Sequence, residues 1–367
     1  MTLDLEMSGA ALTAALVDIP SVSGSESRLA DDVEEALRSR KGLEVLRDGN
    51  ALVARTTLGL PTRVVLAGHL DTVPVAKNLP SRKDGDRLYG CGTSDMKSGI
   101  AVMLRLVDCV TKAAEDATRE VTQDVTFVFY DNEEVEAAKS GLGRLARNHR
   151  SWLDAEFAVL LEPTSARVEA GCQGTIRALV VVPGKRAHSA RAWLGENAIH
   201  GAGEVLTRLS AYEARSVTLD GLLYREGINA VRIEGGVAGN VIPDRCTMTI
   251  NYRFAPDRTE AEAFAHLQDV LDPYECVLTD SAPGAMPGLS APAAADFLAS
   301  VGGDAVAKFG WTDVARFAEL GIPAVNFGPG DPNLAHTREE YVETPRIAAC
   351  EKALRRWITT GAPTAGD

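Results

Sequence analysis

The sequence predicts an α/β protein with a smaller α+β domain inserted into its main domain. Short apolar runs alternate with helix-like segments up to residue 161, which is typical of a mixed or parallel sheet flanked by helices. Between residues 174 and 285 the order of segments changes, and beyond residue 285 the α/β pattern returns. The length of 367 residues agrees with two domains, because globular domains average about 150 residues.

The main domain begins with helices and short buried strands. An amphipathic helix is expected near the N-terminus and another at 25–41, where Leu29, Val33 and Leu37 recur on one face. The segments expected next are strands at 43–46, 51–54 and 64–67, a helix at 98–117, and strands at 125–130 and 157–161. A strand at 324–327 and a helix from about Thr344 complete this domain.

The inserted domain has its own order of elements. We expect a strand at 175–182, a helix at 196–215, strands at 228–234 and 247–254, a helix at 259–271 and a strand at 274–278. This β-α-β-β-α-β order is that of a ferredoxin-like unit. Stretches rich in Gly and Pro at 171–174 and 281–288 flank it and suit hinges. The main domain should therefore comprise 1–173 and 286–367, and the inserted domain 174–285.

Composition excludes several classes of function. Lys and Arg number 38 and Asp and Glu number 51, so the formal charge is −13, which argues against binding to nucleic acid or to an anionic membrane. Apolar runs fall short of the roughly 18 residues of a membrane span. The six cysteines form no C-x-x-C pair, so we expect reduced thiols in a cytoplasmic protein that acts on a small molecule.

Histidine and carboxylate residues gather where the predicted buried strands end. The pairs His69 with Asp71 and Glu133 with Glu134 each follow such a strand, and Glu162 follows a third. Ligands of α/β sheets collect at the carboxyl ends of the strands. Two further candidates lie in Gly-rich loops, namely Asp95 and His336.

Each of these residues has an ordinary explanation when taken singly. An Asp before a helix is usually an N-cap, and adjacent glutamates are usually solvated. Taken together, two imidazoles and several carboxylates suit zinc, and a two-metal site requires one carboxylate to bridge. An Asp two residues after a His, as Asp71 is after His69, can accept the second ring N–H. The spacing alone therefore favours a dinuclear metal hydrolase.

Five motifs then point to a known family. They read G-H-L-D-T-V-P at 68–74, G-C-G-T-S-D-M-K-S-G at 90–99, D-N-E-E at 131–134, L-E-P-T at 161–164 and H-T-x-x-E at 336–340. In this order, over nearly the whole chain, they resemble the dizinc amidohydrolase and exopeptidase family. The resemblance implies a zinc-exopeptidase-like catalytic domain with a mixed sheet, a lid and dimerisation domain, and two zinc ions per chain. Cobalt or manganese are alternatives at the second site.

The resemblance also implies a role for each residue of the cluster. The metal ligands would be His69, Asp95, Glu134, Glu162 and His336. Asp95 would bridge the ions, Glu162 would complete the His69 site and Glu134 the His336 site. Glu133 would be the general base, and Asp71 would orient His69. The residues alone leave open which of the two adjacent glutamates is the base.

Residues of the inserted domain are implied to meet the substrate. His188 would stabilise the oxyanion on the site of a partner subunit, although an exposed turn histidine is the alternative explanation. Asn240 resembles an asparagine that touches substrate. Arg253 resembles an arginine that grips a carboxylate, with an ordinary strand-surface arginine as the alternative. Gly310 and Thr312 would line the pocket.

The implied activity is zinc-dependent hydrolysis of N-succinyl-LL-2,6-diaminopimelate to succinate and LL-2,6-diaminopimelate, in lysine and diaminopimelate biosynthesis. The alternatives are a related N-acyl-amino-acid deacylase acting on acetylornithine or other acylated amino acids, a dipeptidase, and a catalytically inactive binding protein. We expect a homodimer formed through the inserted domain, with no nucleic-acid or membrane partner.

Overall fold

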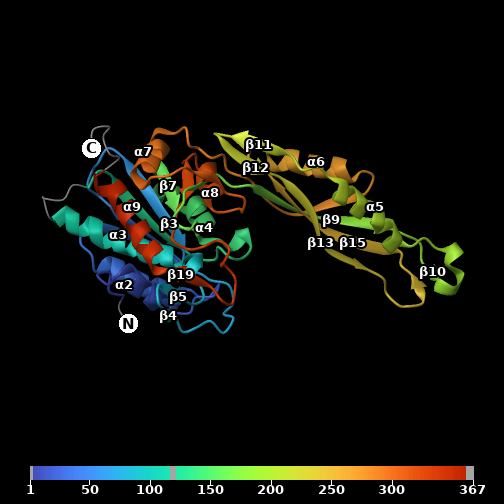
Figure 1. Cartoon of the computed structure of the whole chain (residues 1–367), viewed down its shortest axis with the longest axis horizontal. Helices are drawn as coiled ribbons and strands as arrows, with labels where there is room; N and C mark the ends of the chain where they lie inside the picture. Colours follow the sequence, from blue (N-terminus) through green and yellow to red (C-terminus); the bar gives the residue numbers. More distant parts are fainter. Residues whose placement is uncertain (1–2, 116–120, 361–367) are drawn as a thin grey trace. The chain divides into compact units, whose positions relative to one another are not determined.

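The computed structural model describes residues 3–115 and 121–360, which fall into two units (Figure 1). The first unit takes its residues from Met1–Ala170, Gly288–Val306 and Arg316–Asp367, and the second from Gly171–Pro287 and Ala307–Ala315. The sequence assigns the stretch Ala307–Ala315 to the main domain. In the structure it belongs to the second unit, where the indole N–H of Trp311 donates to the carbonyl of Pro283 at 3.0 Å.

The first unit is built on an eight-stranded mixed sheet. Its strands, in spatial order, are β1 (Leu43–Asp48), β2 (Ala51–Thr56), β6 (Asp124–Tyr130), β3 (Arg63–His69), β7 (Phe157–Leu160), β18 (Ala324–Asn326), β8 (Glu169–Ala170) and β17 (Val306–Ala307). The central strands β6, β3, β7 and β18 are parallel, whereas β1, β2 and β8 pair antiparallel to their neighbours. This arrangement confirms the predicted α/β class.

Burial explains why the central strands read as continuous apolar runs. Val64, Val65, Leu66 and Ala67 are at most 2% exposed, because a parallel strand is covered on both faces. The helices of this unit are α1 (Gly9–Val17), α2 (Ser27–Arg38), α3 (Ser98–Glu115), α4 (Gly141–Asn148), α7 (Pro292–Val301), α8 (Val314–Glu319, whose first two residues belong to the second unit) and α9 (Thr344–Thr360). Helix α3 packs against α1 and α9, and Figure 1 shows α3 and α9 side by side. The last residues of the helix predicted at 98–117 lie outside the described residues.

A small sheet beside the main one was not predicted. It consists of β19 (Tyr341–Glu343), β5 (Arg87–Tyr89) and β4 (Arg82–Asp84), in that order. Its strands have three residues each and carry charged side chains, so they show no apolar period. The guanidinium of Arg82 lies 4.3 Å from the ring centre of Tyr89, and that of Arg87 lies 4.6 Å from the ring centre of Tyr341.

The second unit has the predicted ferredoxin-like order of elements. Its antiparallel sheet runs β13 (Gly227–Gly235), β15 (Arg245–Phe254), β9 (Gly174–Pro183) and β16 (Glu275–Ala282). Two helices, α5 (Ala198–Ala211) and α6 (Glu260–Leu271), pack on it around one apolar core. A two-stranded ladder of β10 (Ala187–His188) and β14 (Val241–Ile242) lies at one end of this unit (Figure 1).

The predicted helix at 196–215 is too long. The helix α5 ends at Ala211, and the chain then forms a hairpin of β11 (Ser216–Leu219) and β12 (Leu222–Arg225). Asp220 and Gly221 form the turn with φ of 47° and 81°, as a two-residue hairpin turn requires. The Asp-Gly pair is the sequence signal for this hairpin. Among the described residues, no helix has both the length and the apolar character needed to cross a bilayer.

Candidate metal centre

The strand ends of the first unit bring the predicted cluster together. His69 is the last residue of β3 and is 1% exposed. Glu133 and Glu134 follow β6, and Glu162, which is 5% exposed, follows β7. Because β6, β3 and β7 are parallel neighbours, their carboxyl ends lie at the same edge of the sheet.

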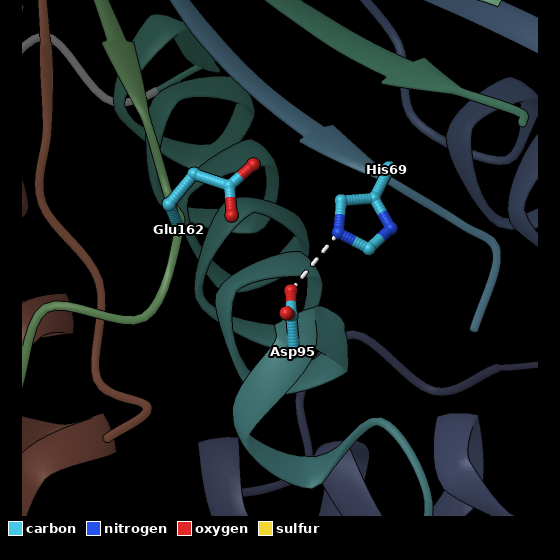
Figure 2. A group of neighbouring side chains, drawn as sticks. All are labelled: His69, Asp95 and Glu162. Atoms are coloured by element: carbon cyan, nitrogen blue, oxygen red, sulfur yellow. Dashed lines mark hydrogen bonds and ion pairs between the residues drawn. The ribbon is translucent and has the colours of Figure 1, made fainter. Parts of the chain in front are cut away.

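Asp95 comes from an irregular turn, Thr93–Lys97, between β5 and α3. The turn follows Gly92, whose φ of +82° is readily adopted by glycine. Its carboxylate reaches the strand end, where Asp95 Oδ1 lies 3.1 Å from His69 Nε2. Figure 2 shows His69, Asp95 and Glu162 pointing toward one another, and their ligand atoms lie within 4.8 Å of each other.

His336 arrives from the loop between β18 and β19, with a φ of +62°. Its Nε2 lies 3.0 Å from Glu134 Oε1 and 3.5 Å from Asp95 Oδ2. The two oxygens of Asp95 therefore face two different histidines, which is the arrangement of a carboxylate that bridges two metal ions. The groups His69–Asp95–Glu162 and Asp95–Glu134–His336 share Asp95, so the donor set fits a dinuclear metal.

Asp71 fixes the ring of His69. His69 Nδ1 lies 3.0 Å from the main-chain oxygen of Asp71 and 3.5 Å from its Oδ1, which leaves Nε2 facing Asp95. Burial by itself lowers the pKa of His69. The hydrogen bonds to Asp71 and Asp95 outweigh burial and hold that pKa well above its usual value. A ring held by its other nitrogen in this way is prepared to act as a metal ligand.

The same carboxylate positions the adjacent glutamates. Asp71 is completely buried and accepts hydrogen bonds from the amides of Glu133 and Glu134, each at 3.0 Å, and from Ser23 Oγ at 2.8 Å. Burial raises the pKa of Asp71, but the interaction with His69 and the two amides lowers it to about 2. Asp71 therefore remains ionised and ties the end of β3 to the segment after β6.

Interactions between opposite charges shift the pKa values of Asp95 and His336 in opposite directions. Hydrogen bonds to Asp95 and Glu134 raise the pKa of His336 to about 10, against the opposing effect of burial. Burial raises the pKa of Asp95, but hydrogen bonds with His336 and His69 outweigh it and hold that pKa well below its usual value. In the absence of metal, the raised pKa values of both histidines favour their protonated forms, and metal binding must displace these protons.

One buried acid beside the cluster was given no role by the sequence. Glu340 is 2% exposed, and its carboxylate faces the main chain of the turn that holds Asp95. Burial raises the pKa of Glu340 to about 7. The signal was present in the fifth motif, where an acid follows His336 by four residues.

The remaining predicted residues belong to the second unit. His188 lies in the β10–β14 ladder, where the amide of Ser189 donates to the main-chain oxygen of Asn240 at 2.9 Å. The amide of Ala190 donates to His188 Nδ1 at 3.0 Å, so a neutral ring carries its proton on Nε2. In this ladder His188 is paired with Val241, and Asn240 precedes Val241 in the sequence.

Arg253 and the two pocket candidates form the other group. Arg253 is half-buried on β15, and its pKa is lowered by burial and by nearby Arg177. Gly310 and Thr312 lie in Ala307–Ala315, and the Thr312 carbonyl lies 3.7 Å from the sulfur of Cys172.

Residues 65–360 match the family model of the peptidase family M20/M25/M40, and the chain therefore belongs to this family. The resemblance carried by the five motifs is thereby confirmed.

Two relatives cover nearly the whole chain. A Mycobacterium tuberculosis protein (strain H37Rv), provisionally named succinyl-diaminopimelate desuccinylase DapE, is 57% identical over 359 residues, which are 97% of this chain and 99% of the relative. A succinyl-diaminopimelate desuccinylase of Corynebacterium glutamicum is 47% identical over 365 residues, which are 97% of this chain and 98% of the relative.

Solved structures share the fold. A tripeptidase from Staphylococcus aureus superposes with a TM-score of 0.78 at 21% identity and covers 98% of each chain. Bacillus subtilis YXEP, described as a dinuclear metal-binding peptidase of the M20 family, superposes with a TM-score of 0.66 at 17% identity and covers 94% of each chain.

Proposed function

We propose that this enzyme hydrolyses N-succinyl-LL-2,6-diaminopimelate to succinate and LL-2,6-diaminopimelate, in the cytoplasmic synthesis of lysine and diaminopimelate. Metal-dependent hydrolysis is supported by the position of the Asp95 carboxylate, whose two oxygens face His69 and His336. The choice of substrate is supported by two relatives, 57% and 47% identical in sequence to this chain, whose names give this activity.

The centre suits two zinc ions. One ion would be held by His69, Asp95 and Glu162, and the other by Asp95, Glu134 and His336. Imidazole nitrogens and carboxylate oxygens are the donors that zinc takes in hydrolases, and cobalt or manganese could occupy the second site. When bound, the ions supply positive charge that polarises the amide carbonyl and acidifies a water molecule.

Glu133 is the residue we assign as general base. Its ligand atom lies within 4.8 Å of those of His69 and Glu134, while neither three-residue ligand group that contains Asp95 includes it. Its main chain is anchored, because its amide donates to Asp71 Oδ1 at 3.0 Å. Glu133 would take the proton of the attacking water and deliver it to the leaving nitrogen.

The second unit would supply the groups that recognise the substrate. Within residues 3–115 and 121–360 no carboxylate pairs with Arg253, so its half-buried guanidinium can receive a substrate carboxylate as a two-pronged donor. Asn240 would add an amide contact, and Gly310 and Thr312 would line the pocket. His188, supplied by the partner copy, would donate from Nε2 to the oxyanion.

The surface of the second unit supports a homodimer. β13 is an edge strand, and its Val231 and Ile233 are 59% and 49% exposed. Ile199 of the neighbouring helix α5 is 42% exposed. An open strand edge with apolar side chains is suited to pairing with the same strand of a second copy.

The test compares N-succinyl-LL-2,6-diaminopimelate with N-acetylornithine as substrates of the zinc-loaded protein. We expect the succinyl compound to be strongly preferred in kcat/KM. An R253K variant should raise KM for the succinyl compound, because an ammonium cannot replace the guanidinium fork. R177K is the matched control, since Arg177 is exposed and pairs with Asp280 at 3.7 Å. Preference for the acetyl compound would indicate the deacylase alternative instead.

A further inference from the structure

Glu340 contacts the turn that carries the central ligand of the metal centre. Its Oε1 accepts hydrogen bonds from the amides of Ser94 at 2.8 Å and Asp95 at 3.0 Å. Its Oε2 accepts a third from the amide of Gly92 at 2.9 Å. One buried carboxylate therefore binds three main-chain amides within four consecutive residues, and one of them belongs to Asp95 itself.

The turn needs this partner because it is not a regular helix. Asp95 has φ −121° and ψ 94°, and Met96 has φ −134° and ψ 37°, both outside the helical region. The amides of Thr93 and Lys97 donate to the main-chain oxygens of Gly90 and Gly92. The amides of Gly92, Ser94 and Asp95 donate to Glu340 instead, and a buried amide without an acceptor would be strongly unfavourable. The carboxylate of Glu340 satisfies the three amides and fixes where the Asp95 side chain starts.

The turn and the loop that bears His336 are joined at further points. Ser94 Oγ donates to the main-chain oxygen of Tyr341 at 2.8 Å and accepts from the amide of Asp331 at 3.1 Å. The amide of Gly90 donates to the main-chain oxygen of Glu340 at 3.1 Å. These hydrogen bonds join the turn that carries Asp95 to the segment that carries His336, and Glu340 makes several of them.

We propose that Glu340 is a positioning residue, which holds Asp95 so that one of its oxygens faces His69 and the other faces His336. The proposal rests on the proposed function only in taking Asp95 as the bridging ligand. Hydrogen-bond partners behind metal ligands typically affect metal affinity by about 10- to 100-fold when they are removed.

The test measures zinc affinity of the full chain by competition with a chromophoric chelator, for the wild type, E340Q and E339Q. Glutamine keeps the shape of Glu340 but replaces one acceptor with a donor that faces an amide. We expect E340Q to bind zinc about 10- to 100-fold more weakly, with a lower kcat and an unchanged KM. The E339Q variant is the matched control, because Glu339 is exposed and adjacent in sequence, and it should behave as wild type.

A second readout separates positioning from stability alone. The visible spectrum of the cobalt-loaded protein reports the geometry around the metal, and it should differ between wild type and E340Q. A folded E340Q protein with wild-type zinc affinity and an unchanged cobalt spectrum would overturn the proposal, even if its unfolding temperature were lower.

Should E340Q not fold, E340D applies the same test, because it keeps the charge and withdraws the carboxylate by one methylene; wild-type zinc affinity in that protein would overturn the proposal. A wild type that binds zinc yet leaves the succinyl substrate intact would refute the proposed function, while the affinities would still decide the role of Glu340.

Discussion

Replacing Asp71 with asparagine tests how the centre is organised without touching a metal ligand. Asp71 is completely buried and accepts hydrogen bonds from Ser23, Glu133 and Glu134, while His69 Nδ1 faces its main-chain oxygen and Oδ1. Asparagine keeps the shape but has only one carbonyl oxygen, so its amide group must face a donor. The variant D71N should therefore loosen both the ring of His69 and the segment of the two glutamates.

The size of the effect follows from the pKa of Asp71. That pKa is lowered from 3.8 to about 2, so the folded chain favours the ionised form by a factor of roughly 60, which corresponds to roughly 2 kcal/mol. Because the pKa is depressed, this stabilisation is present in full above about pH 4 and is lost as the pH falls toward about 2. A neutral asparagine should forfeit it at pH 7.

Hydrogen exchange of the metal-free protein measures this loss. At pH 7 the amides of β3 and β6 should exchange up to about 60-fold faster in D71N than in wild type, where exchange requires opening of the first unit. D84N is the matched control, since the side chain of Asp84 is 71% exposed, and it should exchange as wild type. Equal protection of β3 and β6 in D71N and wild type would show that the Asp71 carboxylate does not hold these strands together.

Three further outcomes are expected. E133Q should keep its zinc, measured by elemental analysis, yet its kcat should fall by about 10²- to 10⁴-fold. The control E136Q, at an exposed position, should stay active. Substantial activity in E133Q would contradict the assignment of Glu133 as general base. Calorimetric zinc titration at pH 7.5, in buffers of different ionisation heat, should show that zinc binding releases protons, because the pKa values of His69 and His336 are raised. The zinc affinity should rise with pH up to about pH 10, the pKa of His336. Zinc binding without proton release would be inconsistent with these raised pKa values. On the proposed dimer, the wild type should sediment as a dimer and I233D, at an exposed position of β13, as a monomer. An unchanged sedimentation coefficient in I233D would exclude β13 as the dimer interface.

The sequence was most informative where local pattern and topology coincide. Continuous apolar runs identify the buried parallel strands, and the rule that their carboxyl ends share an edge predicts that His69, Glu133 and Glu162 lie together. The roles of the individual residues came from the motifs rather than from the spacing. Asp95 in particular belongs to a turn with non-helical dihedral angles that no periodicity describes.

Other features depend on contacts between segments that are distant in sequence. The three-residue strands of the sheet that contains β19 carry no apolar signal, and their pairing arises only when the chain is folded. The stretch Ala307–Ala315 joins the second unit through contacts such as that of Trp311 with Pro283. Glu340 belongs to the fifth motif, but the contact that gives it a role, with three main-chain amides 245 to 248 positions away, exists only in the folded chain.

On the proposed function, the cluster around Asp95 hydrolyses the succinyl substrate only when metal is bound. The most direct measurement adds zinc stepwise to the metal-free protein and follows hydrolysis of N-succinyl-LL-2,6-diaminopimelate. We expect no hydrolysis without metal and a rate that rises to a plateau as about two ions bind per chain. Equal hydrolysis in the presence of chelator, or none once two zinc ions are bound, would contradict the proposed function.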